Sequence, residues 1–184
     1  MIQIKNRYTK KVLLEFESLI GADLKGVDLS SADLTDSDLT DSDLTDSDLR
    51  GANLRRANLY CADLNCVDLR DSDLRGANLS GVDLRDSDLR DSDLRGANLS
   101  DVDLNCVDLK GADLKGAYLK GAINYYSFVA YDTSKRLVHC IKHETTWMIK
   151  AGCFWGTLEE LEIKVLDTHK SSVYLANIEI LKTI

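Results

Sequence analysis

The chain has 184 residues, a formal net charge of −8 and a sequence pI of about 4.9. This acidity argues against direct binding of nucleic acid, because neutralising phosphates requires clustered Lys and Arg. No segment has the pattern of a secretory signal, and no stretch approaches the roughly 18 apolar residues of a membrane span. We therefore expect a cytoplasmic protein that does not associate with membranes and whose partners are basic.

Residues 1–20 predict a β-hairpin that caps the repeats beginning at residue 21. Ile2 and Ile4 alternate with polar residues before a short polar turn, and Val12, Leu14 and Phe16 alternate after it. Alternation with a period of two is typical of a half-buried strand. A cap is expected because the end of a stacked repeat body leaves apolar side chains and backbone groups uncovered.

Residues 21–123 contain a strict five-residue repeat. Leucine occurs at every fifth position from Leu24 to Leu119, preceded by a small residue and then Asp or Asn, and followed by two mostly polar residues. Neither a helix nor a flat strand would maintain this period over a hundred residues. The repeat therefore indicates a solenoid, in which each short unit is stable only when stacked on copies of itself.

This motif resembles that of the pentapeptide-repeat family. The resemblance implies a mainly β fold: a right-handed, four-sided β-helix with one pentapeptide per side, so that twenty repeats give about five coils. The decapeptide DSDLRGANLS occurs at residues 71–80 and again at 91–100, which fits a coil of twenty residues. In similar bacterial and phage proteins an NRYTG-type hairpin precedes the repeats, and Lys10 stands here where Gly is usual.

Each side of the predicted coil is named by its first leucine. The Leu24 face, for example, consists of the pentapeptides centred on Leu24 and on every twentieth residue after it, up to Leu104. The Leu24, Leu29, Leu34 and Leu39 faces carry formal charges of −5, −3, 0 and −2. Acidity is thus concentrated on two adjoining faces. Six acidic residues of the Leu24 face, each at a motif position or at the following corner, are the candidate binding residues: Asp43, Asp46, Asp63, Asp83, Asp86 and Asp103.

The pattern supports three functional hypotheses. The first is a non-enzymatic, rigid scaffold that presents these Asp columns to a protein partner. The second comes from the resemblance: quinolone-resistance members of the family bind DNA gyrase and are thought to imitate duplex DNA, so gyrase or another DNA-binding protein is a candidate partner. The motif also places Asp beside Leu whatever the function, so the acidity is equally explained as a solvated surface.

The third hypothesis is an enzyme or metal protein, and the five cysteines bear on it. They form no CxxC pair with matching histidines, which favours reduced thiols, and Cys61, Cys66 and Cys106 fall at corner positions as structural residues. In the tail, metal-binding residue types occur without a zinc-site spacing: His139, Cys140, His143, Cys153 and His169. No phosphate-binding or dinucleotide motif occurs, so we expect no cofactor.

Residues 124–184 predict a small α+β unit that covers the last coil. Strands are expected at 127–131, 136–143 and 145–151, which are rich in Val, Ile and aromatic residues. Helices are expected from Thr157, with Glu160 completing a capping box, and from Ser171 or Ser172. Their apolar faces also suggest a homodimer formed through this unit, as terminal helices do in gyrase-binding relatives.

Overall fold

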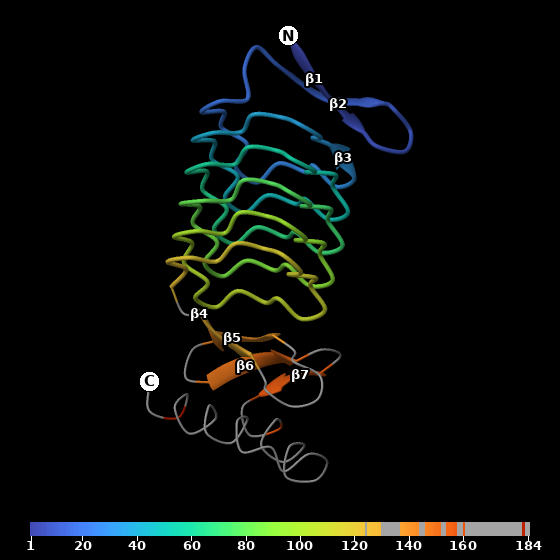
Figure 1. Cartoon of the computed structure of the whole chain (residues 1–184). Coiled ribbons are helices and arrows are strands. Elements are labelled where there is room, and N and C mark those ends of the chain that lie inside the picture. The colour runs from blue at the N-terminus through green and yellow to red at the C-terminus, as the bar shows by residue number, and fades with distance from the viewer. Residues whose placement is uncertain are drawn as a thin grey trace. The chain divides into compact units, whose positions relative to one another are not determined.

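The computed structural model describes residues 1–123, 125–129, 137–143, 146–151, 154–157, 160 and 182. The chain forms two compact units, Met1–Ile123 and Asn124–Ile184. The first contains the hairpin and the repeats (Figure 1). In the part of the chain that is described, no helix has the length and apolar character needed to cross a bilayer.

The predicted hairpin is present at the N-terminus. Strands β1 (Ile2–Asn6) and β2 (Val12–Phe16) pair in antiparallel fashion, with an irregularity between Ile4 and Lys5. Lys10, in the connecting turn, has a φ of 60°, and its N–H donates to the carbonyl of Asn6. This left-handed conformation explains why Gly is the usual residue there, since a side chain strains it.

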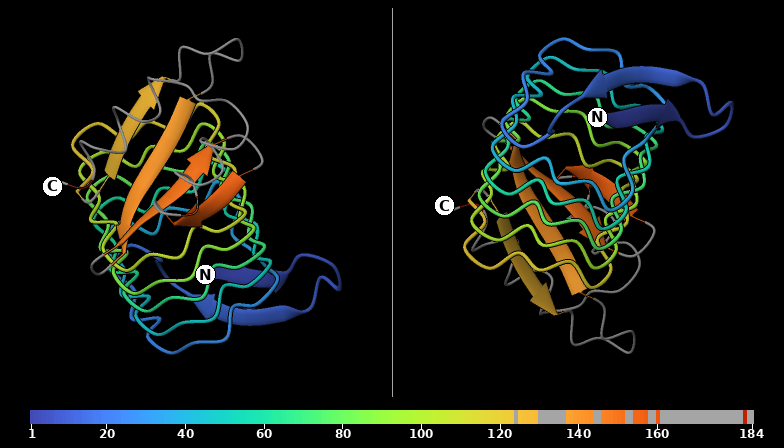
Figure 2. Two further views of the ribbon diagram at one scale, coloured as in Figure 1. Left: turned by 90° about the horizontal axis from the view of Figure 1, so that it is seen from below. Right: turned by 90° about the horizontal axis from the view of Figure 1, so that it is seen from above.

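The hairpin pairs with one side of the first coil. Strand β3 (Ala32–Asp33) pairs with β1 at Lys5 and Asn6, giving a sheet in the order β2-β1-β3. Arg7 strengthens this junction, because its side chain donates to the carbonyl of Gly51 in the next coil at 2.8 Å. Viewed along the coil axis, the two strands lie over one side of the stack and their turn extends beyond it (Figure 2).

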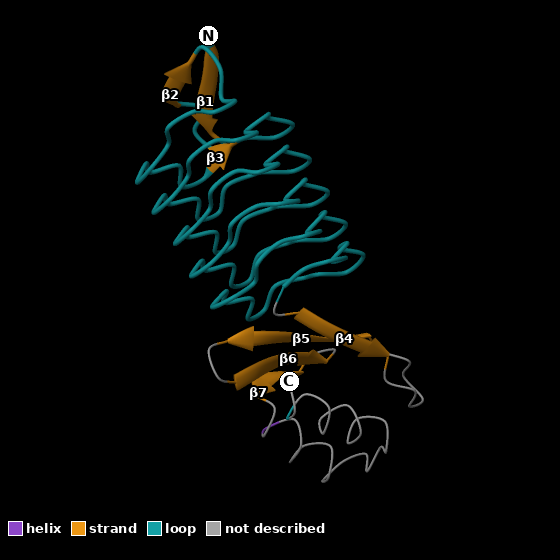
Figure 3. Ribbon diagram, turned by 90° about the vertical axis from the view of Figure 1, so that its left-hand side faces the viewer, coloured by secondary structure: helices purple, strands orange, loops and turns teal. Residues whose placement is uncertain are grey.

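The repeats wind as a β-helix with a coil of twenty residues. Parallel bridges join each Asp or Asn of the motif to the residue twenty positions on, from Asp23↔Asp43 to Asp103↔Ile123. The resulting stack of short bridges is drawn as loops in Figure 3. The predicted core is confirmed, because every leucine from Leu24 to Leu114 is exposed by 2% or less.

The pentapeptide from Ser42 to Asp46 shows how the motif satisfies its backbone. Three N–H groups donate to neighbouring coils: Asp43 to Ala22, Leu44 to Asp63 and Asp46 to Asn65. The N–H of Ser42 closes a turn onto the carbonyl of Leu39 at 3.1 Å. The remaining N–H, that of Thr45, donates to Oδ1 of Asp43 at 2.9 Å. The Asp of the motif is therefore a backbone partner, which is a structural role that Asn fills equally well.

The corners impose a second local requirement. Every fifth residue from Gly21 to Gly121 has a φ between 54° and 78°. This left-handed region is open to Gly at no cost and is tolerated best by Asn and Asp among other residues. Asp occupies seven of these corners, all of them exposed: Asp36, Asp41, Asp46, Asp71, Asp86, Asp91 and Asp101. The backbone thus accounts for much of the acidity at the corners.

The second unit contains a four-stranded antiparallel sheet in the order β4-β5-β6-β7. Its strands are β4 (Tyr125–Val129), β5 (Leu137–His143), β6 (Thr146–Ala151) and β7 (Phe154–Thr157). The three strands expected from the sequence overlap β4, β5 and β6, and β7 was not expected. The short Phe-Trp-Gly-Thr run of β7 lacks the alternation by which a strand is recognised.

The predicted capping box begins at the last residue of β7, Thr157. The N–H of Thr157 donates to the Glu160 carboxylate at 2.8 Å, and the N–H of Glu160 donates to Oγ1 of Thr157 at 3.2 Å. These reciprocal bonds satisfy two donors that the start of a helix leaves free. The rest of both predicted helices, and Cys153 and His169, lie outside the described residues.

Candidate functional site

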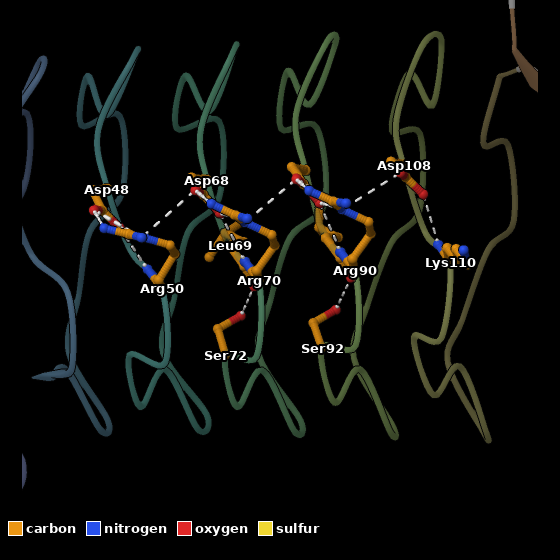
Figure 4. A network of polar contacts seen from close by, with 12 residues as sticks. Asp48, Arg50, Asp68, Leu69, Arg70, Ser72, Arg90, Ser92, Asp108 and Lys110 are labelled. Carbon is orange, nitrogen blue, oxygen red and sulfur yellow. Dashed lines mark hydrogen bonds and ion pairs between the residues drawn. The ribbon is translucent and has the colours of Figure 1, made fainter.

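The Leu29 face carries a continuous ladder of ion pairs. Arg70 donates to its own Asp68 through Nε and through Nη2, and Nε lies 3.5 Å from Asp88 of the next coil. The same arrangement recurs with Arg50 and Arg90 (Figure 4). Each guanidinium therefore lies between two motif carboxylates. The net charge of −3 on this face corresponds to Asp28 and the corner residues Asp71 and Asp91, not to the ladder column.

The Leu34 face repeats this ladder. Arg75 bonds to Asp73 and lies 3.4 Å from Asp93, while Arg95 bonds to Asp93 and lies 3.7 Å from Asp113. At the corner, Arg56 makes a bidentate pair with Asp36, with both distances at 2.7 Å. A single exposed pair contributes little, but a network of shared, bidentate pairs contributes more.

The motif positions of the Leu39 face are mostly uncharged. Asn98 donates to Asn78 at 3.1 Å, Asn78 donates to Asn58 at 2.9 Å, and Asn58 donates to Asp38 at 3.2 Å. The amides all point the same way, so their positive ends are directed at the Asp38 carboxylate. This face therefore resembles neither the acidic face nor the two ladder faces.

The Leu24 face holds the candidate residues and lacks the ladder. All five of its motif positions are Asp. The position directly after the leucine, which carries Arg in the two ladders, is instead Thr45, Asn65 or Asn105 in three of the five coils. The ion pairs of this face include Arg85 with Asp83 at 2.6 Å and Lys25 with Asp46 at 3.9 Å, and its formal charge of −5 is the largest of the four faces. Negative charge on this face is thus neutralised less than on its neighbours.

The six candidates form two neighbouring columns on this face. Asp43, Asp63, Asp83 and Asp103 follow one another in the parallel bridges, and Asp46 and Asp86 occupy the adjoining corner. Asp46, Asp63 and Asp86 are exposed, and the others are half-buried. The structure therefore brings all six together on one surface of the first unit.

Cys66 lies in the middle of these carboxylates. Its pKa is raised by burial and then by the negative charges of Asp46, Asp86, Asp63 and Asp83. A raised pKa lowers the thiolate fraction and therefore the reactivity of the thiol. The corner cysteines Cys61, Cys66 and Cys106 are free thiols with φ near 57°. Among the described residues, no group of three or more His, Cys, Asp or Glu side chains is placed to hold a metal ion.

Acid is expected to destabilise the first unit through the ladders. The pKa values of Asp73 and Asp93 are lowered, chiefly by the hydrogen bonds from Arg75 and Arg95. Because the folded state lowers these pKa values, the stabilisation is present above the ordinary pKa of about 4 and is lost as pH falls through the lowered values. Melting temperature measured from pH 7 to pH 2 should fall steeply below about pH 4.

The matched variant for this prediction is Arg75→Gln with Arg95→Gln. Without the guanidinium groups the two aspartates regain more ordinary pKa values, so the loss of stability between pH 4 and pH 2 should be shallower. An equal loss in both proteins would contradict the prediction.

Comparisons with known proteins agree with this fold. A family model for pentapeptide repeats matches in eight copies, over residues 18–51, 37–76, 52–91 and 83–121. Among curated proteins, no match is found.

Several solved structures are similar. The pentapeptide repeat protein Rfr23 from the cyanobacterium Cyanothece 51142 is 29% identical, over 56% of this chain and 84% of its own, with a TM-score of 0.41. A pentapeptide repeat protein from the thylakoid lumen of Arabidopsis thaliana is 31% identical, over 54% of this chain and 63% of its own, with a TM-score of 0.37. A trypsin-treated variant of QnrB1, a plasmid-mediated fluoroquinolone resistance protein, is 22% identical, over 57% of this chain and 69% of its own, with a TM-score of 0.39.

The family-model matches extend together from residue 18 to residue 121, which is more than half of the chain. They cover the same residues in which leucine, the motif carboxylates and the left-handed corners recur every five positions. The chain belongs to the pentapeptide repeat family.

Proposed function

We propose that the protein is a non-enzymatic interaction scaffold, a right-handed solenoid of about five coils that presents the acidic columns of its Leu24 face to a basic protein partner. The observation that carries the proposal is the contrast between faces. Arginine ladders pair most motif aspartates of the Leu29 and Leu34 faces, whereas the Leu24 face has Arg at that position only at Arg85 and keeps the largest formal charge, −5. A surface with excess negative charge on a rigid body suits electrostatic recognition.

The requirements of the fold do not explain this contrast. The motif needs an Oδ1 acceptor for the N–H two residues on, and Asn supplies it at Asn53, Asn58, Asn78 and Asn98. Asp at all five motif positions of the Leu24 face therefore exceeds what the backbone demands. The excess charge is available for binding.

A partner that ordinarily binds DNA, such as gyrase, is the more specific version of this proposal. Motif carboxylates in successive coils recur at the strand spacing of about 4.8 Å, and duplex DNA carries one charge per roughly 1.7 Å. With ten net negative charges on residues 21–123, the charge density is of the same order. Duplex DNA should then compete with the protein for its partner.

Two quadruple variants test the proposal. In the first, Asp43, Asp63, Asp83 and Asp103 are changed to Asn; in the second, Asp48, Asp68, Asp88 and Asp108 are changed to Asn. Both remove four negative charges and keep the Oδ1 acceptors, but the second alters the Leu29 face. Melting temperatures establish that each variant is folded.

Bacterial lysates are then passed over each immobilised protein and the retained proteins are identified by mass spectrometry. We expect basic proteins that are lost with the first variant and kept with the second. Release of those proteins by duplex DNA would support the DNA-mimic version. The same set retained by both variants would show that the Leu24 column is only a solvated surface.

A further inference from the structure

A cleft opens between the hairpin and the first coil. Its volume is about 320 Å³, and it is lined by residues 2–4, Leu19 and residues 33–38. Ile4, Leu19 and Leu34 are exposed by 2% or less, whereas Ile2 is exposed by 44%. The cleft thus has a buried apolar floor, and it lies on the Leu34 and Leu39 sides of the coil, away from the Leu24 face.

Two carboxylates on the coil side are held in fixed orientations. Oδ1 of Asp33 accepts from the N–H and hydroxyl of Thr35 and from Asn53. Oδ1 of Asp38 accepts in the same way from Thr40 and from Asn58, behind which lies the amide chain of the Leu39 face.

The second oxygen of each carboxylate is open. Throughout the described part of the chain, Oδ2 of Asp33 and Oδ2 of Asp38 have no hydrogen bond or ion pair. Asp36, the third acidic residue of the lining, differs because both of its oxygens bind Arg56. The lining of the cleft therefore includes two carboxylates, each with one fixed and one open oxygen, and such groups suit a cation.

Open strand edges accompany these acceptors. The pairing of β1 with β3 covers only Lys5 and Asn6, so residues 2–4 have no ladder partner on that side. Asp38 forms a bridge only to Asn58, while an interior residue such as Asp43 forms bridges on both sides. Unpaired strand edges are templates for an added strand.

We infer that this cleft binds an extended basic segment of a partner protein. The backbone of the segment pairs with an open edge, the stem of a Lys or Arg side chain packs on the Ile and Leu floor, and its charged head group reaches Oδ2 of Asp33 and Asp38. Long basic side chains combine an apolar stem with a charged end, which is the combination that this lining complements. The volume is at the small end of ligand pockets, about 300 Å³, and fits a side chain rather than a folded surface.

The probe is a fluorescein-labelled hexapeptide of alternating Lys and Val, whose binding to the full chain is followed by fluorescence polarisation. The test variant is Asp33→Asn with Asp38→Asn. The control is Asp23→Asn with Asp28→Asn, which changes the same motif positions of the same coil on the other two faces. All four changes retain an Oδ1 acceptor, so folding is preserved in both.

We expect affinity for the peptide to fall at least tenfold in the test variant, which loses two charge interactions, and by less than about twofold in the control, since a loss of about 1.4 kcal/mol is a factor of ten. A peptide N-methylated at alternate residues should bind more weakly than the parent, because it cannot pair as a strand. The quadruple Asn variant of the Leu24 face should bind the peptide like the wild type, which separates this site from the acidic columns. Absence of binding, equal affinities of the two double variants, or unweakened binding of the methylated peptide would overturn the inference.

Discussion

Replacing Leu74 with Asp is expected to unfold the first unit. Leu74 is fully buried. Its N–H donates to a carbonyl of the next coil, and its own carbonyl accepts from the N–H of Ala77. A carboxylate at this position would lie among stacked leucines without a partner, which costs several kcal/mol even if it takes up a proton. Single domains of this size have about 5–15 kcal/mol of stability in total, so the change removes much or all of it.

Circular dichroism during thermal unfolding measures this effect. Tyr60→Asp is the matched control, because it adds the same charge at an exposed position in the preceding coil. We expect the control to melt within a few degrees of the wild type, and the Leu74→Asp protein to lack a cooperative transition. A Leu74→Asp protein that melts like the wild type would show that the leucine columns do not hold the coils together.

Asn78→Ala is expected to lower the free energy of unfolding by about 1–3 kcal/mol. Oδ1 of Asn78 accepts from the N–H and the hydroxyl of Ser80 and from the amide of Asn98, and its own amide donates to Asn58. Alanine removes all four bonds at a position where solvent access is partial. Leaving half-buried donors without acceptors is more costly than the loss of an exposed pair.

Asn78→Asp is the control for this prediction. It keeps the Oδ1 acceptor and loses only the donor to Asn58, so it should be destabilised less than the alanine variant in urea titrations followed by fluorescence. Equal losses in the two variants would mean that the motif residue does not act through its acceptor oxygen. Together the two variants separate the structural role of the motif position from its charge.

The leucine period was sufficient to predict a stacked repeat body with the leucines inside, and the resemblance to the pentapeptide-repeat family supplied the four-sided coil. The sequence also identified the Leu24 face as the most acidic. It did not show that Asp23 and its equivalents serve the backbone, since that role depends on a hydrogen bond two residues along the chain. It also did not show that corner aspartates such as Asp86 adopt a left-handed conformation.

Other features depend on how coils lie on one another. Counting charges from the sequence includes Arg70 in the net charge of its face. The sequence does not show that Arg70 pairs with Asp88, because the two residues are eighteen positions apart and become neighbours only when the coils stack. The cleft beneath β1 exists because the pairing between β1 and the first coil ends partway along the strand. No local sequence pattern predicts where that pairing ends. Strand β7 has too few residues to show a period. The features that could be predicted depend on residue type and local spacing. The inter-coil ion pairs and the cleft depend instead on which distant residues become neighbours in the fold.

The twenty-residue coil has a consequence for how such a protein changes length. Inserting or deleting twenty residues leaves every side chain on its original face, so the arginine ladders and the acidic columns simply become longer or shorter. Inserting or deleting five residues instead rotates everything beyond that point by a quarter turn, so that the column on each face continues as the column of a neighbouring face. Duplication of whole coils, as the recurring DSDLRGANLS segment suggests, therefore offers a route by which evolution adjusts the length of a binding surface without rebuilding it.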